Sequence, residues 1–284
     1  MRLAILFWFY KDVEVCKNRL QIIRKYNPTL KIFGLFGGDL TKANSFDKKL
    51  SPFLDDFFAF TGNQDPSWKW KNGDLMINHW FKERGHHLEW DSIIIVQADM
   101  VVIGNIPNLF KHLKAGAILL SSIRPVKDVE TWWYWIKEHR QLYDDFYHYL
   151  VNEMGYNQEP ICCQYVIVGL PRVFLEQYCK IKNPELGFIE YRVPMYAQLF
   201  NIPLNVNPNP KLNCWWATDP AMSEVPLSER VLVADKYELP LSRILSNLNK
   251  KEGGRIFHPF DQFFPNNFKS ATKYIYRMVK DSFN

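Results

Sequence analysis

The sequence lacks the charge pattern of a nucleic-acid-binding protein. No run of five or more Lys or Arg residues occurs in its 284 residues, and the formal net charge is only +5. A groove for nucleic acid is therefore disfavoured, and a small phosphate-bearing ligand fits this mild positive charge better.

The sequence also has no CxxC pair. An odd number of cysteines without that spacing disfavours a disulfide scaffold or a zinc site, and is typical of a reduced intracellular protein. The five cysteines are Cys16, Cys162, Cys163, Cys179 and Cys214.

No long hydrophobic run opens the chain. The segment "MRLAILFWFYKD" has eight apolar residues before Lys11, whereas a membrane-spanning helix needs about 20. No small-residue cleavage site follows it. We therefore expect a first strand here and a soluble, cytoplasmic protein. Internal repeats and low-complexity linkers are absent too, so a single domain is expected over residues 1–284.

The first part of the chain alternates between strand and helix patterns. Buried strands give apolar runs, and helices give apolar positions at a spacing of three or four. This alternation predicts an α/β fold, with a mostly parallel central sheet covered by helices on both faces. The expected strands are 2–10, 30–38, 57–62 and 90–106, and the expected helices are 12–26 and 72–87.

The second half of the chain is more aromatic. We divide the sequence into a first half (1–110), a second half (111–265) and a basic terminal helix (266–284). Within the second half we expect a long helical region at 129–154, strands at 161–170 and 202–207, and a short helix at 190–201.

One carboxylate stands out within the apolar stretch "WDSIIIVQADMVVIGNI". Asp99 comes where a buried strand leaves the core, and open parallel sheets bind ligands at the carboxyl ends of their strands. An acid there could hold a divalent cation that bridges diphosphate oxygens. Alternatively, Asp99 caps a turn or pairs with an arginine.

These residues resemble a family motif. The order of elements is similar to that of glycosyltransferases of the GT-A fold, in which a DxD motif ends the fourth strand, and Gln97-Ala98-Asp99 occupies the DxD positions. The following "GNI" and "PNLFKHL" also suit that family, and the resemblance covers roughly residues 2 to 260. It implies a nucleotide-sugar donor such as a UDP-sugar, a glycan acceptor and a Mn²⁺ or Mg²⁺ cofactor. It also implies that residues 1–110 are the nucleotide-binding half and residues 111–265 the acceptor-binding half.

The motif departs from the family pattern at Gln97. Glutamine can hydrogen-bond a ribose hydroxyl but is a poor metal ligand. The resemblance then leaves the metal to Asp99 and a late histidine, His258 in "GGRIFHPF", unless the enzyme works without a metal. The alternative for His258 is a loop histidine packed beside Pro259 and Phe260.

The resemblance also assigns nucleotide contacts. Tyr10 would stack on the uracil and Lys11 would reach a phosphate. Asp74 starts the helix that lies beside the nucleotide in this fold, although a helix cap is its simpler role. The nucleotide-binding residues expected in full are Phe9, Tyr10, Lys11, Gly38, Asp74, Gln97 and Asp99.

A catalytic base is expected in "ELGFIEYRVPMYAQLFN". In inverting members of the family, a carboxylate at the start of a short helix deprotonates the acceptor hydroxyl. Glu190 holds that position, with Glu185 as the nearby alternative. The helix N-terminus should favour the charged form of Glu190.

Tryptophans suggest where the acceptor could lie. Sugar rings pack their C–H faces on indoles, and we expect Trp215 and Trp216 to bind the acceptor. A further group, Trp132, Trp133 and Trp135, cannot share one helix face, so at least one should be exposed or border a cleft.

Other interpretations stay open. A sugar-nucleotide nucleotidyltransferase would carry an early Gly-rich loop, and "FWFYKDVEVCKN" has no glycine. Gln97 makes a catalytically silent nucleotide- or sugar-binding protein conceivable.

The basic terminal helix could touch an anionic membrane peripherally, or it could be a solvated face. Its cationic stripe consists of Lys269, Lys273, Arg277 and Lys280.

Overall fold

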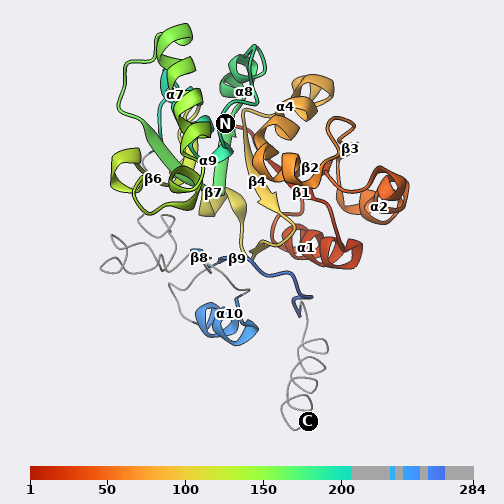
Figure 1. The fold of residues 1–284 in the computed structure, drawn as a ribbon. Helices are drawn as coiled ribbons and strands as arrows, with labels where there is room; N and C mark the ends of the chain where they lie inside the picture. The colour runs from red at the N-terminus through yellow and green to blue at the C-terminus, as the bar shows by residue number, and fades with distance from the viewer. Residues whose placement is uncertain (206–230, 234–238, 250–254, 266–284) are drawn as a thin grey trace.

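The computed structural model describes residues 1–205, 231–233, 239–249 and 255–265 (Figure 1). Its centre is a six-stranded sheet in the order β3-β2-β1-β4-β7-β6. The first four strands are parallel, and β7 is antiparallel to both of its neighbours. The predicted α/β class with a mostly parallel sheet is confirmed. The strands are β1 (Leu3–Phe9), β2 (Lys31–Phe36), β3 (Asp56–Ala59), β4 (Ser92–Gln97), β6 (Leu119–Pro125) and β7 (Ile161–Pro171).

Helices cover both faces of this sheet (Figure 1). Successive side chains of a strand point to opposite faces, so both sets in β1 are apolar and meet separate cores. Ile5, Phe7 and Phe9 pack in the core that includes α1 and α2. Ala4 and Leu6 pack in the core that includes α4, α7, α8 and α9. These helices are α1 (Val13–Tyr26), α2 (Ala43–Leu50), α4 (Gly73–Glu83), α7 (Arg140–Met154), α8 (Arg172–Tyr178) and α9 (Ile189–Leu199).

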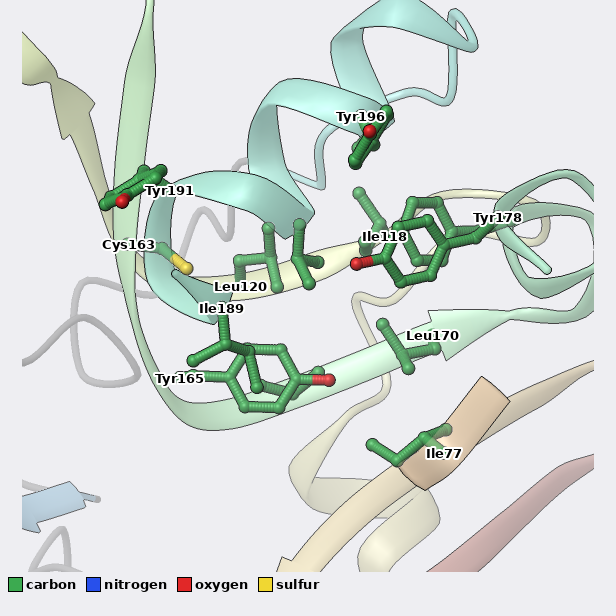
Figure 2. Close-up of a cluster of buried hydrophobic side chains, with 14 of the residues drawn as sticks. Ile77, Ile118, Leu120, Cys163, Tyr165, Leu170, Tyr178, Ile189, Tyr191 and Tyr196 are labelled. Atoms are coloured by element: carbon green, nitrogen blue, oxygen red, sulfur yellow. The ribbon is translucent and has the colours of Figure 1, made fainter. Parts of the chain in front are cut away.

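Aromatic side chains fill much of the second core. Figure 2 shows Tyr165 of β7, Tyr178 of α8 and Tyr196 of α9 among aliphatic neighbours. Tyr178 and Tyr196 lie with their ring centroids 5.3 Å apart. The aromatic richness of the second half of the chain is therefore largely core packing.

Short elements complete the described part. They are α3 (Pro66–Lys71), α5 (Ile106–Leu109), α6 (Tyr134–Lys137), α10 (Leu241–Leu248) and a small sheet of β5 (Val101–Val102), β9 (Ile256–His258) and β8 (Val231–Val233). Single 3-10 turns lie at Leu40–Lys42, Ser51–Phe53, Gly85–His87 and Val126–Asp128. None of the helices in the described ranges is both long and apolar enough to span a bilayer.

Several expected elements differ in the structure. The stretch 90–106 is not one strand, because β4 ends at Gln97 and the chain turns before β5 pairs with β9. The region 129–154 holds two helices, α6 and α7, instead of one. At 202–207, the described residues form only an isolated bridge between Ile118 and Leu204. The expected terminal helix at 266–284 lies outside the described residues.

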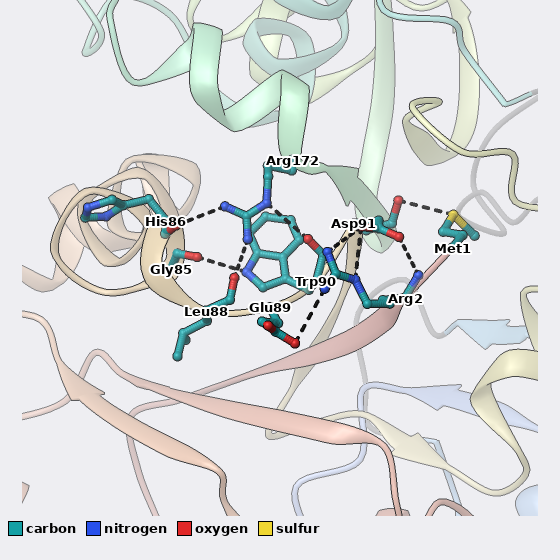
Figure 3. A network of polar contacts seen from close by, with 10 residues as sticks. Met1, Arg2, Gly85, His86, Leu88, Glu89, Trp90, Asp91 and Arg172 are labelled. Atoms are coloured by element: carbon teal, nitrogen blue, oxygen red, sulfur yellow. Dashed lines mark hydrogen bonds and ion pairs between the residues drawn. The ribbon is translucent and has the colours of Figure 1, made fainter.

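A polar network fixes the amino end of β4 (Figure 3). The Arg172 guanidinium at the start of α8 donates to the carbonyls of Trp90 (3.0 Å), His86 (3.2 Å) and Leu88, and lies over the Trp90 ring. Arg2 donates to Asp91 from its backbone N–H and from its guanidinium. These contacts anchor the sheet at its amino edge, which leaves the carboxyl edge for a ligand site.

Candidate active site

A pocket of about 240 Å³ opens at the carboxyl ends of β1 and β4. The turn after β1, the turn after β4 and the segment after β9 supply its walls. Carboxyl ends of adjacent parallel strands meet at one edge, which explains why residues nearly ninety positions apart line one pocket. The lining residues are Tyr10, Lys11, Asp12, Val15, Ala98, Asp99 and Asp261.

The turn from β1 into α1 is held by Asp12. Its backbone has a φ of 49°, in the left-handed region that Asp tolerates better than most residues. Its Oδ1 accepts the backbone N–H groups of Glu14 (3.2 Å) and Val15 (3.0 Å), which caps the first turn of α1. This cap fixes where Tyr10 and Lys11 leave the strand.

The segment after β9 is attached to α1 by two buried side chains. Arg19 donates to the carbonyls of Phe260 (2.7 Å) and Gln262 (2.6 Å). Asn18 exchanges two hydrogen bonds with the backbone of Phe264, at 2.8 and 2.9 Å. Because both side chains are almost fully buried, the segment is firmly seated, and it brings Asp261 to the pocket.

Asp99 and His258 lie next to each other at the end of β9. Asp99 Oδ2 lies 3.4 Å from His258 Nε2. Burial acts to raise the pKa of Asp99, but the neighbouring His258 and Lys11 outweigh it, and the pKa lies below its ordinary value. Asp99 therefore keeps its negative charge at the pocket wall.

This pair fits a divalent cation. Two ligands bonded to one ion at about 2.1 Å lie about 3.0–3.4 Å apart, as these two atoms do. Asp99 Oδ1 is buried without a hydrogen-bond partner among the described residues. No group of three His, Cys, Asp or Glu side chains suited to a metal occurs in the described ranges, so further ligands would come from substrate and water.

Lys11 belongs to the same group of charged side chains in the pocket. Its Nζ is 2.9 Å from Asp261 Oδ2, and that hydrogen bond raises the pKa of Lys11. Tyr10 beside it is 52% exposed, with the Lys11 ammonium 5.2 Å from its ring centroid. The pocket thus combines one lysine with three carboxylates, a formal charge of −2 when His258 is neutral.

Gln97 and Glu190 contact the same residue of β7. Gln97 Nε2 donates to the Tyr165 carbonyl (3.2 Å), and the Tyr165 N–H donates to Glu190 Oε1 (3.2 Å). The β4–β7 pairing ends at Ile95 and Val168, so the backbone of Tyr165 is available for these side chains. Glu190 is therefore separated from the DxD-like segment by one residue of β7.

The charge state of Glu190 differs from the sequence expectation. It lies in the first turn of α9, but it is 8% exposed and its Oε2 is buried without a hydrogen-bond partner among the described residues. Burial raises the pKa of Glu190 to about 8. The helix N-terminus was expected to keep this group charged, and desolvation outweighs it.

Four residues expected at the nucleotide do not line the pocket. Gln97, which donates to the Tyr165 carbonyl, is one of them, and the others are Phe9, Gly38 and Asp74. Phe9 is fully buried and packs against Phe36, with 5.5 Å between ring centroids. Gly38 does not line the pocket: a Cβ there would lie 2.4 Å from the Tyr10 carbonyl, so glycine allows this close approach. Both are corrections, because strand packing and loop packing account for these residues.

Asp74 is a further correction. It is 2% exposed, and its carboxylate takes hydrogen bonds from Arg192 Nε (2.9 Å) and Nη2 (2.5 Å) and from the Tyr178 hydroxyl. It is not the helix cap either, because α4 begins after Asn72. Asp74 serves as the buried partner of Arg192 and is not available to a nucleotide.

The two groups of tryptophans singled out in the sequence are only partly described by the structure. Trp215 and Trp216 lie outside the described residues. Trp132, Trp133 and Trp135 do not share a helix, and none of them is highly exposed.

The sequence analysis missed Asp12 and Asp261 as pocket residues. Asp12 follows Lys11 directly, so its place just after the first strand could have identified it. No local pattern marks Asp261, which reaches the pocket through contacts of the segment after β9 with Lys11, Arg19 and Asp99.

Comparisons with known proteins give remote likenesses only. No known protein family matches the chain, and no curated protein matches its sequence. Among solved structures, the WbbM bifunctional glycosyltransferase in its apo form aligns with a TM-score of 0.45 at 10% identity, over 94% of this chain and 47% of that chain. The chain thus spans about half the length of that protein. Mouse xyloside xylosyltransferase 1, also apo, aligns with a TM-score of 0.41 at 12% identity, over 90% and 97% of the two chains. Similarities this remote do not decide the function, which is inferred from the site itself.

Proposed function

We propose that the protein is a glycosyltransferase that moves a sugar from a nucleoside diphosphate, such as a UDP-sugar, to a hydroxyl of a glycan. The observation that carries this proposal is the pocket at the carboxyl edge, which Lys11 and Asp99 line. His258 lies beside Asp99, and one residue of β7 separates Gln97 from Glu190. Transfer of a sugar from a nucleoside diphosphate requires charged groups that hold the diphosphate and a nearby carboxyl group that accepts a proton.

The charge balance of the pocket explains how a diphosphate could bind. Three carboxylates against one lysine would repel an anion, so the diphosphate needs a cation between it and the protein. Asp99 and His258 would hold Mn²⁺ or Mg²⁺, and the metal would neutralise charge on the departing diphosphate. Lys11 would add a second positive charge from the β1 side.

The remaining residues supply orientation and proton transfer. Exposed Tyr10 would stack on the base at the pocket mouth, and Gln97 would orient the donor by hydrogen bonding. The acceptor oxygen forms a bond to the anomeric carbon while the bond to the diphosphate oxygen breaks. Glu190 Oε2 takes the hydroxyl proton, and the in-line attack inverts the configuration.

A pKa of about 8 suits that role. A general base works best when its pKa is near the working pH, and burial achieves this for Glu190. The proposal requires the acceptor hydroxyl to supply the hydrogen bond that Oε2 lacks.

Nucleotide release tests the proposal. Purified protein is incubated with a panel of nucleotide sugars and manganese, and released nucleotide is measured. Asp99→Asn should abolish manganese-dependent release, whereas Asp145→Asn should not, because Asp145 is an exposed carboxylate of α7. Full activity in Asp99→Asn would remove the metal-site assignment. Thermal stabilisation by nucleotides without turnover would favour the second candidate, a silent nucleotide-binding protein, which the glutamine at Gln97 makes plausible.

A further inference from the structure

A group of aromatic side chains forms a surface beside the proposed site. We call Trp70, Tyr134, Trp135, His139 and Phe188 the aromatic platform. Trp70 and Tyr134 are 57% and 51% exposed, whereas Trp135 and Phe188 are buried beneath them. Ring centroids are 4.5 Å apart for Trp70 and Trp135, and 4.9 Å apart for Tyr134 and Trp135. Trp135 stacks on Phe188 at 3.8 Å.

The aromatic platform is assembled at the carboxyl edge of the sheet. Trp70 belongs to α3, whose Lys69 donates to the carbonyl of Gly37 just after β2 (2.9 Å). Tyr134 belongs to α6, which follows the carboxyl end of β6, and β6 runs in the same direction as β4 because both are antiparallel to β7. Phe188 is the residue at which α9 starts, two positions before Glu190. The platform is therefore continuous with the proposed catalytic group.

A buried network holds two parts of the aromatic platform in place. Arg192, one half-turn after Glu190, donates to Asn72 Oδ1 (2.9 Å) as well as to Asp74. Asn72 lies at the junction of α3 and α4, two residues after Trp70. This network ties the α3 end that carries Trp70 to the α9 start that carries Phe188 and Glu190. A rigid, preformed aromatic surface loses little entropy when a ligand binds.

Core packing accounts for Trp135 and Phe188 but not for the exposed rings. Trp70 and Tyr134 each contact the same buried ring, Trp135, and exposed aromatic side chains grouped in this way mark interaction sites more often than isolated ones do. In the described ranges, Trp70 and Tyr134 are the highly exposed large apolar side chains of this surface. Two rings are too few for a protein interface of about 1,600 Å² or for membrane insertion. They match the size of one or two sugar rings.

We propose that the aromatic platform binds a pyranose ring of the glycan acceptor. Its C–H face would pack on Trp70 and Tyr134, while its hydroxyls would hydrogen-bond the Tyr134 hydroxyl, His139 and the charged side chains of α3 and α6. This inference rests on the proposed function, because it makes the bound ring the neighbour of the sugar that presents its hydroxyl to Glu190.

Saturation-transfer NMR with free sugars tests the aromatic platform directly. The probes are cellotetraose, maltotetraose, chitotetraose and a mannotetraose, chosen because their C–H faces differ. At least one should receive saturation from the aromatic protons of the full-length protein. Trp70→Ala and Tyr134→Ala should each weaken its binding about tenfold, and Trp70→Phe should restore most of it.

Tyr26→Ala is the matched control. Tyr26 is 38% exposed at the end of α1 and is not part of the platform, so this variant should bind the sugars like the wild type. Far-UV circular dichroism and urea unfolding confirm that each variant is folded. Equal saturation transfer from Trp70→Ala, Tyr134→Ala and the wild type, or no saturation transfer from the wild type to any probe, would overturn the proposal.

UDP binding separates this outcome from failure of the proposed function. Titration of UDP in the presence of manganese measures binding at the pocket, and Trp70→Ala should leave this UDP affinity unchanged. Sugar binding that depends on Trp70, in a protein that binds no UDP, would keep the aromatic platform as a carbohydrate site and reject the transferase. UDP binding with no Trp70-dependent sugar contact would reject the platform alone.

Discussion

The buried carboxyl group of Glu190 makes folding stability depend on pH in a defined direction. Its pKa rises from an ordinary value of 4.5 to about 8 because the side chain is desolvated. The folded state then holds its proton more tightly than the unfolded state. This contribution is fully present below about pH 4.5 and is lost as the pH rises to about 8, at about 1.4 kcal/mol per pH unit.

Glu190→Gln isolates this contribution. The amide keeps the shape of the protonated acid and can still accept the Tyr165 N–H, but it cannot ionise. The variant should match the wild type near pH 5 and gain on it by about 4 kcal/mol between pH 5 and pH 8. Other titrating groups affect both proteins alike, so the difference between them reports Glu190.

Urea unfolding of both proteins at several pH values measures this difference. The free energies are compared at each pH, and equal m-values confirm that the same surface is exposed. A difference that stays constant from pH 5 to pH 8 would refute the reasoning, because it would show that Glu190 titrates in its ordinary range.

Other perturbations test the remaining parts of the account. Gln97→Asp should lower the manganese concentration needed for half-maximal nucleotide release, because it restores an acid pair; an unchanged requirement would place Gln97 away from the metal. Arg192→Met should lower the free energy of unfolding by about 3–5 kcal/mol, because Asp74 is left buried without its partner, and a loss below about 1 kcal/mol would contradict this. Glu190→Gln should slow sugar transfer by about 10²–10⁴-fold with unchanged UDP affinity, and the wild-type rate should rise with pH up to about 8. The same loss in Glu185→Gln, with Glu190→Gln active, would move the base upstream, and a product with retained configuration would reject in-line attack.

The sequence predicted the strands whose apolar residues form an uninterrupted local pattern. In β1, apolar side chains at both alternating sets of positions predicted a strand covered on both faces, and two cores are found there. β6 was not predicted, since Ser121 and Ser122 interrupt its apolar run. The structure places register shifts at this point and gives Ser122 a φ of 56°.

Part of the candidate site could be predicted, because some of its residues lie just after parallel strands. Lys11 and Asp99 follow β1 and β4 directly, and the parallel sheet brings them together. Asp74 could not be interpreted correctly because its partner, Arg192, is 118 residues away and burial of the pair depends on the whole second core. The raised pKa of Glu190 has the same origin, since the packing of α9 on β7 removes its solvent.

A crystal soaked with UDP and manganese shows whether the pocket at the carboxyl ends of β1 and β4 holds a metal-bound nucleoside diphosphate. The anomalous signal of manganese identifies the ion independently of the nucleotide. We predict an anomalous peak within about 2.3 Å of Asp99 and His258, with diphosphate density between that peak and Lys11. Ordered UDP elsewhere on the protein, or manganese that does not contact Asp99, would contradict the account.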